Sequence, residues 1–290
     1  MRKTILTAAI VFSLAPVIAM AQNEKDTAWK ISGETALNFS QVSLTNWAAG
    51  GQSSVSGNAF FNIGANYEKG KNIWINKLEL AYGLQKQGEE DFRKTNDKID
   101  LSTSYGYEAA KNWYYTSILS FRSQFSDGYD YPNDSVVIST FLAPAYVIGA
   151  LGMEYRPNEH FSAAIMPFSG KLTIVNDDTL SAQGAFGVDP GDKTRIEFGG
   201  TVQLAYKQQI VENVDLQSTL QLFSNYLENP QNIDVNWETM INMKINEFLS
   251  ANITTTLIYD HDIKITDQDG NTGPRTQFKE VFGLGLSYKF

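Results

Sequence analysis

A cluster of aspartates near the end of the chain has the clearest potential for metal chemistry. Carboxylate oxygens are the ligands that Ca²⁺ and Mg²⁺ prefer in proteins, so the cluster predicts a loosely bound divalent cation. An EF-hand is excluded, because numbering from Asp267 puts Thr272 at the glycine position and Phe278 at the bidentate acid position. A solvated turn stays the alternative interpretation, and no other cofactor is expected. The four aspartates are Asp260, Asp262, Asp267 and Asp269.

Nucleophilic catalysis has little support in the sequence. The chain has no cysteine and only two histidines, His160 and His261. A barrel lipid hydrolase needs a serine beside its histidine, yet residues 263–266 after His261 are Ile, Lys, Ile and Thr. The sequence therefore predicts that the protein is not an enzyme, and lipid hydrolysis is the least favoured of its candidate functions.

The elements that would position such side chains are indicated by an alternation of apolar and polar residues after Gln22. Leu78 and Leu80, for example, alternate with Lys77 and Glu79. A period of two is that of a β-strand with one apolar and one polar face. We count about twelve such segments, most of about 11–16 residues, and no convincing helical period of 3.6 residues.

The lengths of these segments and of their connections predict a membrane barrel. Soluble strands usually have about 5–6 residues, whereas a tilted strand needs about 9–11 residues to cross a bilayer. Short connections such as 109–112 alternate with longer ones such as 126–139, as in outer-membrane barrels. The sequence thus predicts an all-β, transmembrane, antiparallel up-and-down β-barrel of about 12 strands with both termini periplasmic. A soluble β-sandwich, which also alternates, is the alternative.

The charged side chains assign the polar strand face to the barrel interior. A Lys or Arg facing lipid costs roughly 2–4 kcal/mol at the bilayer midplane, so we expect these residues to line the lumen. The interior carries both signs of charge, and the acidic excess lies largely in the external loops. Those loops could bridge to surface glycolipid through divalent cations, or their charge could serve only solubility. The lumen-lining candidates are Lys77, Glu79, Asp100, Arg122, Glu154, Arg195, Glu197, Asp215, Glu238 and Lys279.

The overall composition excludes several other classes of protein. A helical membrane protein needs repeated runs of 18 or more apolar residues. A chain with 42 % hydrophobic and 19 % charged residues does not have such repeated runs. The aromatic content of 12 % is too high for a disordered chain. A net charge of −9 gives no electrostatic support for binding nucleic acid, so no nucleic-acid partner is expected.

Both ends of the chain carry targeting features. Arg2 and Lys3 precede an apolar stretch, and an Ala-Met-Ala cleavage pattern ends at Ala21. The sequence predicts a signal peptide over residues 1–21, Sec-type export with cleavage near Ala21, and a single outer-membrane β-barrel domain over residues 22–290 in a diderm bacterium. An uncleaved, buried N-terminal helix is the alternative. The terminal Phe290 resembles the signal by which the barrel-assembly machinery recognises its substrates.

The first predicted external loop carries a glycine-rich motif, Asn46-Trp47-Ala-Ala-Gly50-Gly51. The two glycines suit a tight bend, and the tryptophan could enter the barrel mouth or join an aromatic girdle. This loop resembles the opening signature of a family of Bacteroidota outer-membrane proteins, the domain of unknown function numbered 3078. The resemblance extends over essentially the whole mature chain and implies a barrel and its location, but no activity and no catalytic residues. Further stretches that fit it are Phe141–Tyr155, Pro167–Val175 and Gln277–Phe290.

Two functions agree with a polar barrel interior. The first is a narrow pore for small solutes, because twelve strands lie between the roughly 8 that give a filled interior and the 16–18 that give an aqueous channel. The alternative is a non-conducting structural or accessory barrel that binds another envelope protein. An open path along the axis would favour transport, and packed ion pairs would favour the accessory role. Expected partners are outer-membrane lipid, surface glycolipid and the assembly machinery.

Overall fold

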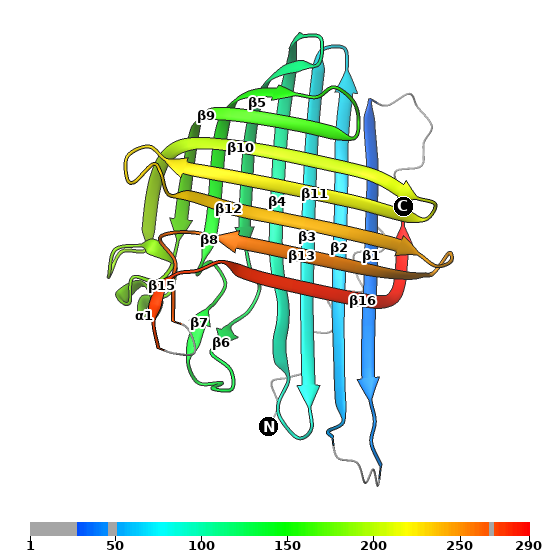
Figure 1. The fold of residues 1–290 in the computed structure, drawn as a ribbon, viewed down its shortest axis with the longest axis vertical. Helices are drawn as coiled ribbons and strands as arrows, with labels where there is room; N and C mark the ends of the chain where they lie inside the picture. The colour runs from blue at the N-terminus through cyan, green and yellow to red at the C-terminus, as the bar shows by residue number, and fades with distance from the viewer. Residues whose placement is uncertain (1–27, 46–50, 267–269) are drawn as a thin grey trace.

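The computed structural model describes residues 28–45, 51–266 and 270–290, which form one closed antiparallel barrel (Figure 1). Consecutive barrel strands pair with one another, and the first pairs with the last, as predicted for a transmembrane up-and-down barrel of twelve strands. The predicted signal peptide lies outside the described residues. The barrel strands are β1 (Trp29–Val42), β2 (Ser54–Lys69), β3 (Asn72–Gln87), β4 (Arg93–Ala110), β5 (Trp113–Ser123), β8 (Ala145–Tyr155), β9 (Phe161–Ile174), β10 (Thr194–Val211), β11 (Val214–Asn225), β12 (Ile233–Lys244), β13 (Leu249–Tyr259) and β16 (Gln277–Lys289).

The strands are strongly inclined, so that the two walls of the barrel cross each other in projection. Figure 1 shows β10 to β13 running across the view, over β1 to β4, which run from top to bottom. Closure of a sheet into a barrel requires such a tilt, typically about 35–45° from the axis. Side chains on the inner faces of opposite walls therefore point at each other from strands that cross.

The two ends of the barrel differ in the length of the connections between strands. We call them the turn end and the loop end. At the turn end, two-residue connections use left-handed backbone at Gly70, Asn112 and Asn213, as hairpin turns require. Trp29 and Phe290 lie at this end. Longer connections at the loop end hold the remaining elements, which are β6 (Gly128–Tyr129), β7 (Val137–Ser139), α1 (Asp178–Ala182), η2 (Ala185–Gly187), β14 (Lys264–Thr266) and β15 (Thr272–Pro274).

The distribution of side chains is inverted relative to a soluble domain. Large apolar residues are exposed on the outer face, for example Phe168 at 63 % and Ile165 at 62 % of their accessible surface. Residues buried on the inner face of the same region include Ser169, Lys171 and Thr173. Lipid is the solvent for which an apolar outer belt around a polar interior is stable. Neither described helix is long and apolar enough to cross a membrane.

Two prolines lie where the ladder is interrupted. Pro144 immediately precedes β8, so it needs no partner within that strand. Pro167 lies in β9 beside shifts in register between Leu151 and Met153 on one neighbour and between Gly199 and Thr201 on the other. Because the regular hydrogen-bond ladder is interrupted at these bulges, the N–H that proline lacks is not needed there. β9 can therefore stay within the barrel wall.

A single arginine on either face of β11 tests which face meets lipid. Leu220 faces outward, and Thr219 faces the lumen opposite Glu238. We expect Leu220→Arg to lower the free energy of unfolding in liposomes by about 2–4 kcal/mol, because it places a charge in hydrocarbon. Thr219→Arg is the matched control and should cost less than about 1 kcal/mol beside that carboxylate. Equal losses in denaturant titrations of the two variants would contradict the assigned orientation.

Candidate functional site in the barrel lumen

An ion pair joins opposite walls of the barrel. The Lys98 Nζ on β4 lies 2.6 Å from Glu79 Oε2 on β3 and 2.7 Å from Glu238 Oε2 on β12. In the ring of twelve strands β4 and β12 are six places apart, so these two strands face each other across the lumen. A direct contact between them means that side chains cross the full width of the interior at this level.

Further polar contacts surround this bridge. Lys77 pairs with the same glutamate of β3, and Arg122 on β5 donates to Asp100 on β4 at 2.9 Å. From β16, Lys279 Nζ donates to Asn96 Oδ1 on β4 at 3.0 Å, which is a second contact between strands that are not neighbours. Acids and bases therefore alternate around the bridge, and each removes part of the cost of placing the others in a confined interior.

A second cluster is centred on Lys171 of β9, toward the loop end. Its buried Nζ lies 2.7 Å from Asp234 Oδ2, 3.1 Å from Asp260 Oδ2 and 3.4 Å from Glu197 Oε2. These carboxylates come from β12, from the connection after β13, and from β10. One ammonium group thus ties three parts of the wall together, donating hydrogen bonds to Asp234 and Asp260 and forming an ion pair with Glu197.

Arg195 of β10 extends this cluster to the barrel mouth. Its Nη2 lies 2.8 Å from Asp262 Oδ2, 3.2 Å from Glu228 Oε2 and 3.6 Å from Glu197 Oε1. Its Nη1 donates to the backbone carbonyl of Gly187 at 3.0 Å. The guanidinium group therefore fastens three connections of the loop end to the barrel, as its fixed fork of donors allows.

The mouth cluster has more acids than bases. Two cations, Lys171 and Arg195, face five carboxylates, so its formal charge is 2 − 5 = −3. A negative opening attracts cations and repels anions. The five carboxylates are Glu197, Glu228, Asp234, Asp260 and Asp262.

Two smaller groups of charges lie toward the turn end. Lys289 Nζ on β16 lies 3.3 Å from Asp215 Oδ2 on β11 and 3.9 Å from Glu34 Oε2 on β1. Because β16 and β11 are three places apart, this contact also passes across the interior. Glu154 at the end of β8 accepts from Arg156 at 2.7 Å. Polar contacts thus occur along the lumen from one end to the other.

The residues selected from the sequence fall on the inner face of the strands, but their partners include residues that the sequence did not single out. Lys98, the cation of the central bridge, lies in the first part of β4, which begins at Arg93. Asn96 lies on the same part of β4, and Lys289 lies on the polar face of β16. The sequence signal that indicates Lys98 and Asn96 is the parity of Asp100, continued toward the start of β4.

Two of the four aspartates of the predicted metal cluster form ion pairs, and the other two are not among the described residues. Asp260 and Asp262 contact Lys171 and Arg195, as given above, so their charges already have partners. Asp267 and Asp269 lie outside the described residues. Across residues 28–45, 51–266 and 270–290 no three acidic or histidine side chains are grouped as metal ligands.

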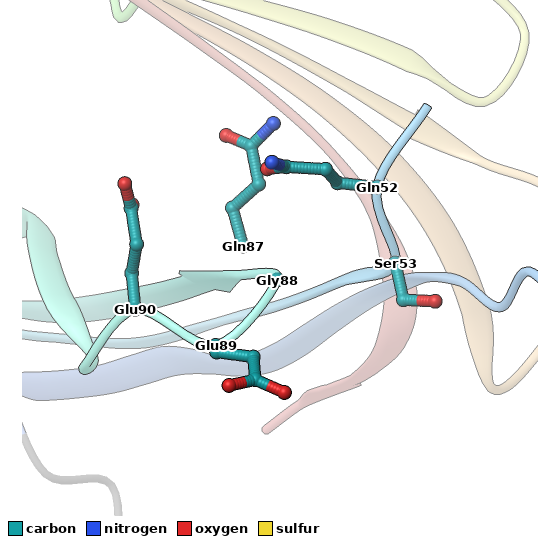
Figure 2. Close-up of a pocket in the computed structure, with 6 residues that line it drawn as sticks. All are labelled: Gln52, Ser53, Gln87, Gly88, Glu89 and Glu90. Atoms are coloured by element: carbon teal, nitrogen blue, oxygen red, sulfur yellow. The ribbon is translucent and has the colours of Figure 1, made fainter. Parts of the chain in front are cut away.

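The glycine-rich loop motif is only partly described, since Asn46, Trp47 and Gly50 fall outside the described residues. Gly51 has a φ of 114°, a left-handed conformation that suits glycine. Nearby, a shallow pocket of about 720 Å³ lies between the connections that follow β1 and β3 (Figure 2). Gln52 and Gln87 point toward each other there, while Glu89 and Glu90 extend in opposite directions. None of the residues that line this pocket belongs to the luminal clusters.

A double-mutant cycle tests the bridge between the walls. We expect Lys98→Met to lower the free energy of unfolding by about 2–3 kcal/mol, because Glu238 would stay in the lumen without its cation. Glu238→Gln alone should cost less. The double variant Lys98→Met/Glu238→Gln should lose less free energy of unfolding than the two single variants lose together. Strictly additive losses in lipid-reconstituted protein would show that the two side chains do not interact.

Comparison with solved structures returns outer-membrane proteins. The translocator domain of the autotransporter NalP from Neisseria meningitidis is 10 % identical, with a TM-score of 0.36, over 95 % of this chain and 93 % of that chain. An outer membrane channel from Pseudomonas putida F1 is 11 % identical, with a TM-score of 0.39, over 90 % and 94 %. OmpT, an outer membrane protein of Vibrio cholerae, is 8 % identical, with a TM-score of 0.32, over 93 % and 100 %.

Comparison by sequence gives one family and no individual relative. Curated proteins give no match. The family model matches residues 39–129, which run from the end of β1 to β6. This range includes the glycine-rich loop but is narrower than the resemblance expected from the sequence. Residues 39–129 match the family described as Protein of unknown function (DUF3078), which confirms the resemblance inferred from that loop.

Proposed function

We propose that the protein is a non-conducting outer-membrane barrel with a structural or accessory role, in which it binds another envelope protein. The bridge from Lys98 to Glu79 and Glu238 is the observation that supports this proposal most strongly. It occupies the interior from one wall to the other. Packed ion pairs of this kind favour the accessory role over an open pore.

The energetics of the lumen support a closed state. Separating a partly buried ion pair leaves each charge without compensation. For comparison, removing one partner from a fully buried pair costs about 3–5 kcal/mol. A solute would have to displace the central bridge and then pass the Lys171 and Arg195 cluster. Two such barriers in series hold an unassisted barrel closed. Binding energy from a partner is one source of the work needed to open it.

The outer surface and the chain ends support the location and orientation that we propose. The apolar outer belt fits the hydrocarbon of an outer membrane, and short turns in such barrels face the periplasm. Both ends of the barrel chain would then be periplasmic. Phe290 exchanges two backbone hydrogen bonds with Gly33, at 2.8 and 3.0 Å, so the residue proposed to bind the assembly machinery also closes the barrel.

A narrow pore for small solutes is the second candidate function. It is favoured by the mouth cluster, whose five carboxylates against two cations would concentrate cations at the loop end. Transport through the same lumen requires that the Lys98 bridge parts during the passage of each solute. The pore would then prefer cations to anions.

Recording from planar bilayers separates the two functions. We expect purified protein to insert without discrete conductance steps at either polarity. The variant Lys98→Ala/Lys171→Ala should conduct, because it removes the central cation of both barriers while the polar wall stays intact. Lys207→Ala is the control, since Lys207 also faces the lumen but makes no ion pair within the described part of the chain.

Steady, cation-selective steps from the unmodified protein would assign it to the pore class. A silent double variant that is folded by heat-modifiable gel migration would show that other side chains close the lumen. In that case the Lys98 bridge would no longer carry the proposal.

A further inference from the structure

The seam that closes the barrel is paired over only part of its length. β1 pairs with β16 from Glu34 to Asn38, and Gly33 adds the contact with Phe290. On its other side β1 pairs with β2 along its full length. The register of this pair ends at Asn38 and Gly285, so among the described residues those at 39–42 of β1 and 277–284 of β16 have no register partner across the seam. Figure 1 shows β16 turning away from β1 and running across the barrel.

Strand parity identifies the backbone groups that this leaves free. Phe290 exchanges both hydrogen bonds with β1, and Ser287 donates to Phe248 on the side of β13. Even-numbered residues of β16 therefore direct their N–H and C=O groups toward β1, and odd-numbered ones toward β13. By the same rule, Phe39 and Gln41 of β1 face the seam. Within the described residues, the groups of β16 that face the seam beyond this ladder belong to Phe278, Glu280 and Phe282.

An unpaired edge at this depth is unfavourable in a membrane. Lipid offers no hydrogen bonds, so each unsatisfied backbone group costs several kcal/mol in hydrocarbon. Membrane barrels normally remove their edges by closing completely. The free groups on β16 lie on the residues whose side chains form the lipid-facing row, which includes Phe278 and Phe282, each 64 % exposed.

A carboxylate on the lipid-facing side lies next to this edge. Glu280 lies between Phe278 and Phe282 on the outer face of β16, opposite Thr255 of β13. It is exposed, and within the described residues it makes no side-chain hydrogen bond or ion pair. Ionisable groups that face hydrocarbon are rare and mark sites that need a partner. A lysine or an arginine is the partner that matches a carboxylate in charge.

The inner side of the same seam also has unsatisfied polar atoms. Asn38, the last paired residue of β1, is only 5 % exposed, and among the described residues neither its Oδ1 nor its Nδ2 has a hydrogen-bond partner. Its side chain lies against Gly283 of β16, where a Cβ would clash with it. The point at which the strands separate therefore leaves donors and acceptors free on the edge and in the lumen.

We propose that this edge, residues 277–284 of β16, receives an extended segment of a partner envelope protein as an added β-strand. The segment would alternate apolar and polar side chains, as a membrane strand must, and would place a lysine or an arginine beside Glu280. The backbone groups of the edge supply affinity, and the carboxylate supplies specificity. This inference rests on the proposed accessory function, and it identifies the surface through which that function acts.

Two proline substitutions test whether the edge is free in the barrel alone. Phe282→Pro removes an N–H that faces the open seam, whereas Val281→Pro removes an N–H that bonds to β13. Phe282→Ala corrects for loss of the ring. We expect Phe282→Pro to fold and melt like Phe282→Ala, and Val281→Pro to abolish the heat-modifiable folded form. Equal damage by both prolines would show that the seam is paired there and would overturn the proposal.

A peptide probe tests the docking itself with protein in nanodiscs. The probe is a dansyl-labelled peptide of about nine residues, enough to cross a bilayer as a tilted strand, that alternates valine and threonine and carries one central lysine. We expect saturable binding, weakened about tenfold by Glu280→Gln and abolished by Phe282→Pro. A peptide with glutamate in place of lysine should bind about tenfold more weakly than the lysine probe.

Absence of saturable binding, or equal affinity for all variants, would overturn the docking proposal. If the unmodified protein dimerised and Phe282→Pro prevented this, the edge would be assigned to a second copy. If both variants bound the probe only in lipid-rich discs, the edge would be assigned to lipid. Either result would overturn the docking proposal. Conductance is not used here, so a conducting barrel with an occupied edge would refute the proposed function while leaving the docking surface in place.

Discussion

Every peptide group within the hydrocarbon needs a hydrogen-bond partner, and this constraint shapes the whole chain. Closed pairing of long strands is the solution that β-structure offers. Alternation then follows, because one face of each strand meets lipid and the other meets the enclosed interior. The two prolines are compatible with this constraint, because Pro144 lies before β8 and Pro167 lies at the bulge of β9. The β1–β16 seam departs from this constraint, and the departure is the basis of the docking site that we propose.

Charges enclosed by such a wall must neutralise one another. The interior contains Lys98, Lys171 and Arg195 within ion-pair distance of carboxylates from several strands. Because the two walls cross, residues from distant strands meet at their inner faces and fill space that a ring of twelve strands could otherwise leave to water. The interior therefore contains layers of ion pairs. Its largest surplus of carboxylates lies at the loop end, where five carboxylates face Lys171 and Arg195.

Much of the fold could be predicted from the sequence, because lipid imposes a period of two on each strand. Strand number, loop rhythm and the polar inner face all follow from that period. The pairing within the lumen could not be predicted. Lys98 and Glu238 are 140 residues apart, and their contact depends on the stagger and crossing of the walls, which alternation does not encode. Asp260 and Asp262 resembled metal ligands only because Lys171 and Arg195 are distant in sequence. The partial seam has no sequence signal, since β16 alternates along its full length.

The bridge across the lumen is the feature on which the proposed closed state depends, and its geometry can be measured directly. Solid-state NMR dipolar recoupling between ¹⁵N in the Lys98 side chain and ¹³C in the Glu238 carboxylate reports their separation in a lipid bilayer. We expect strong dephasing, as for the Nζ–Oε2 contact of 2.7 Å. Absence of dephasing in folded protein would mean that water separates the walls and that the lumen is open.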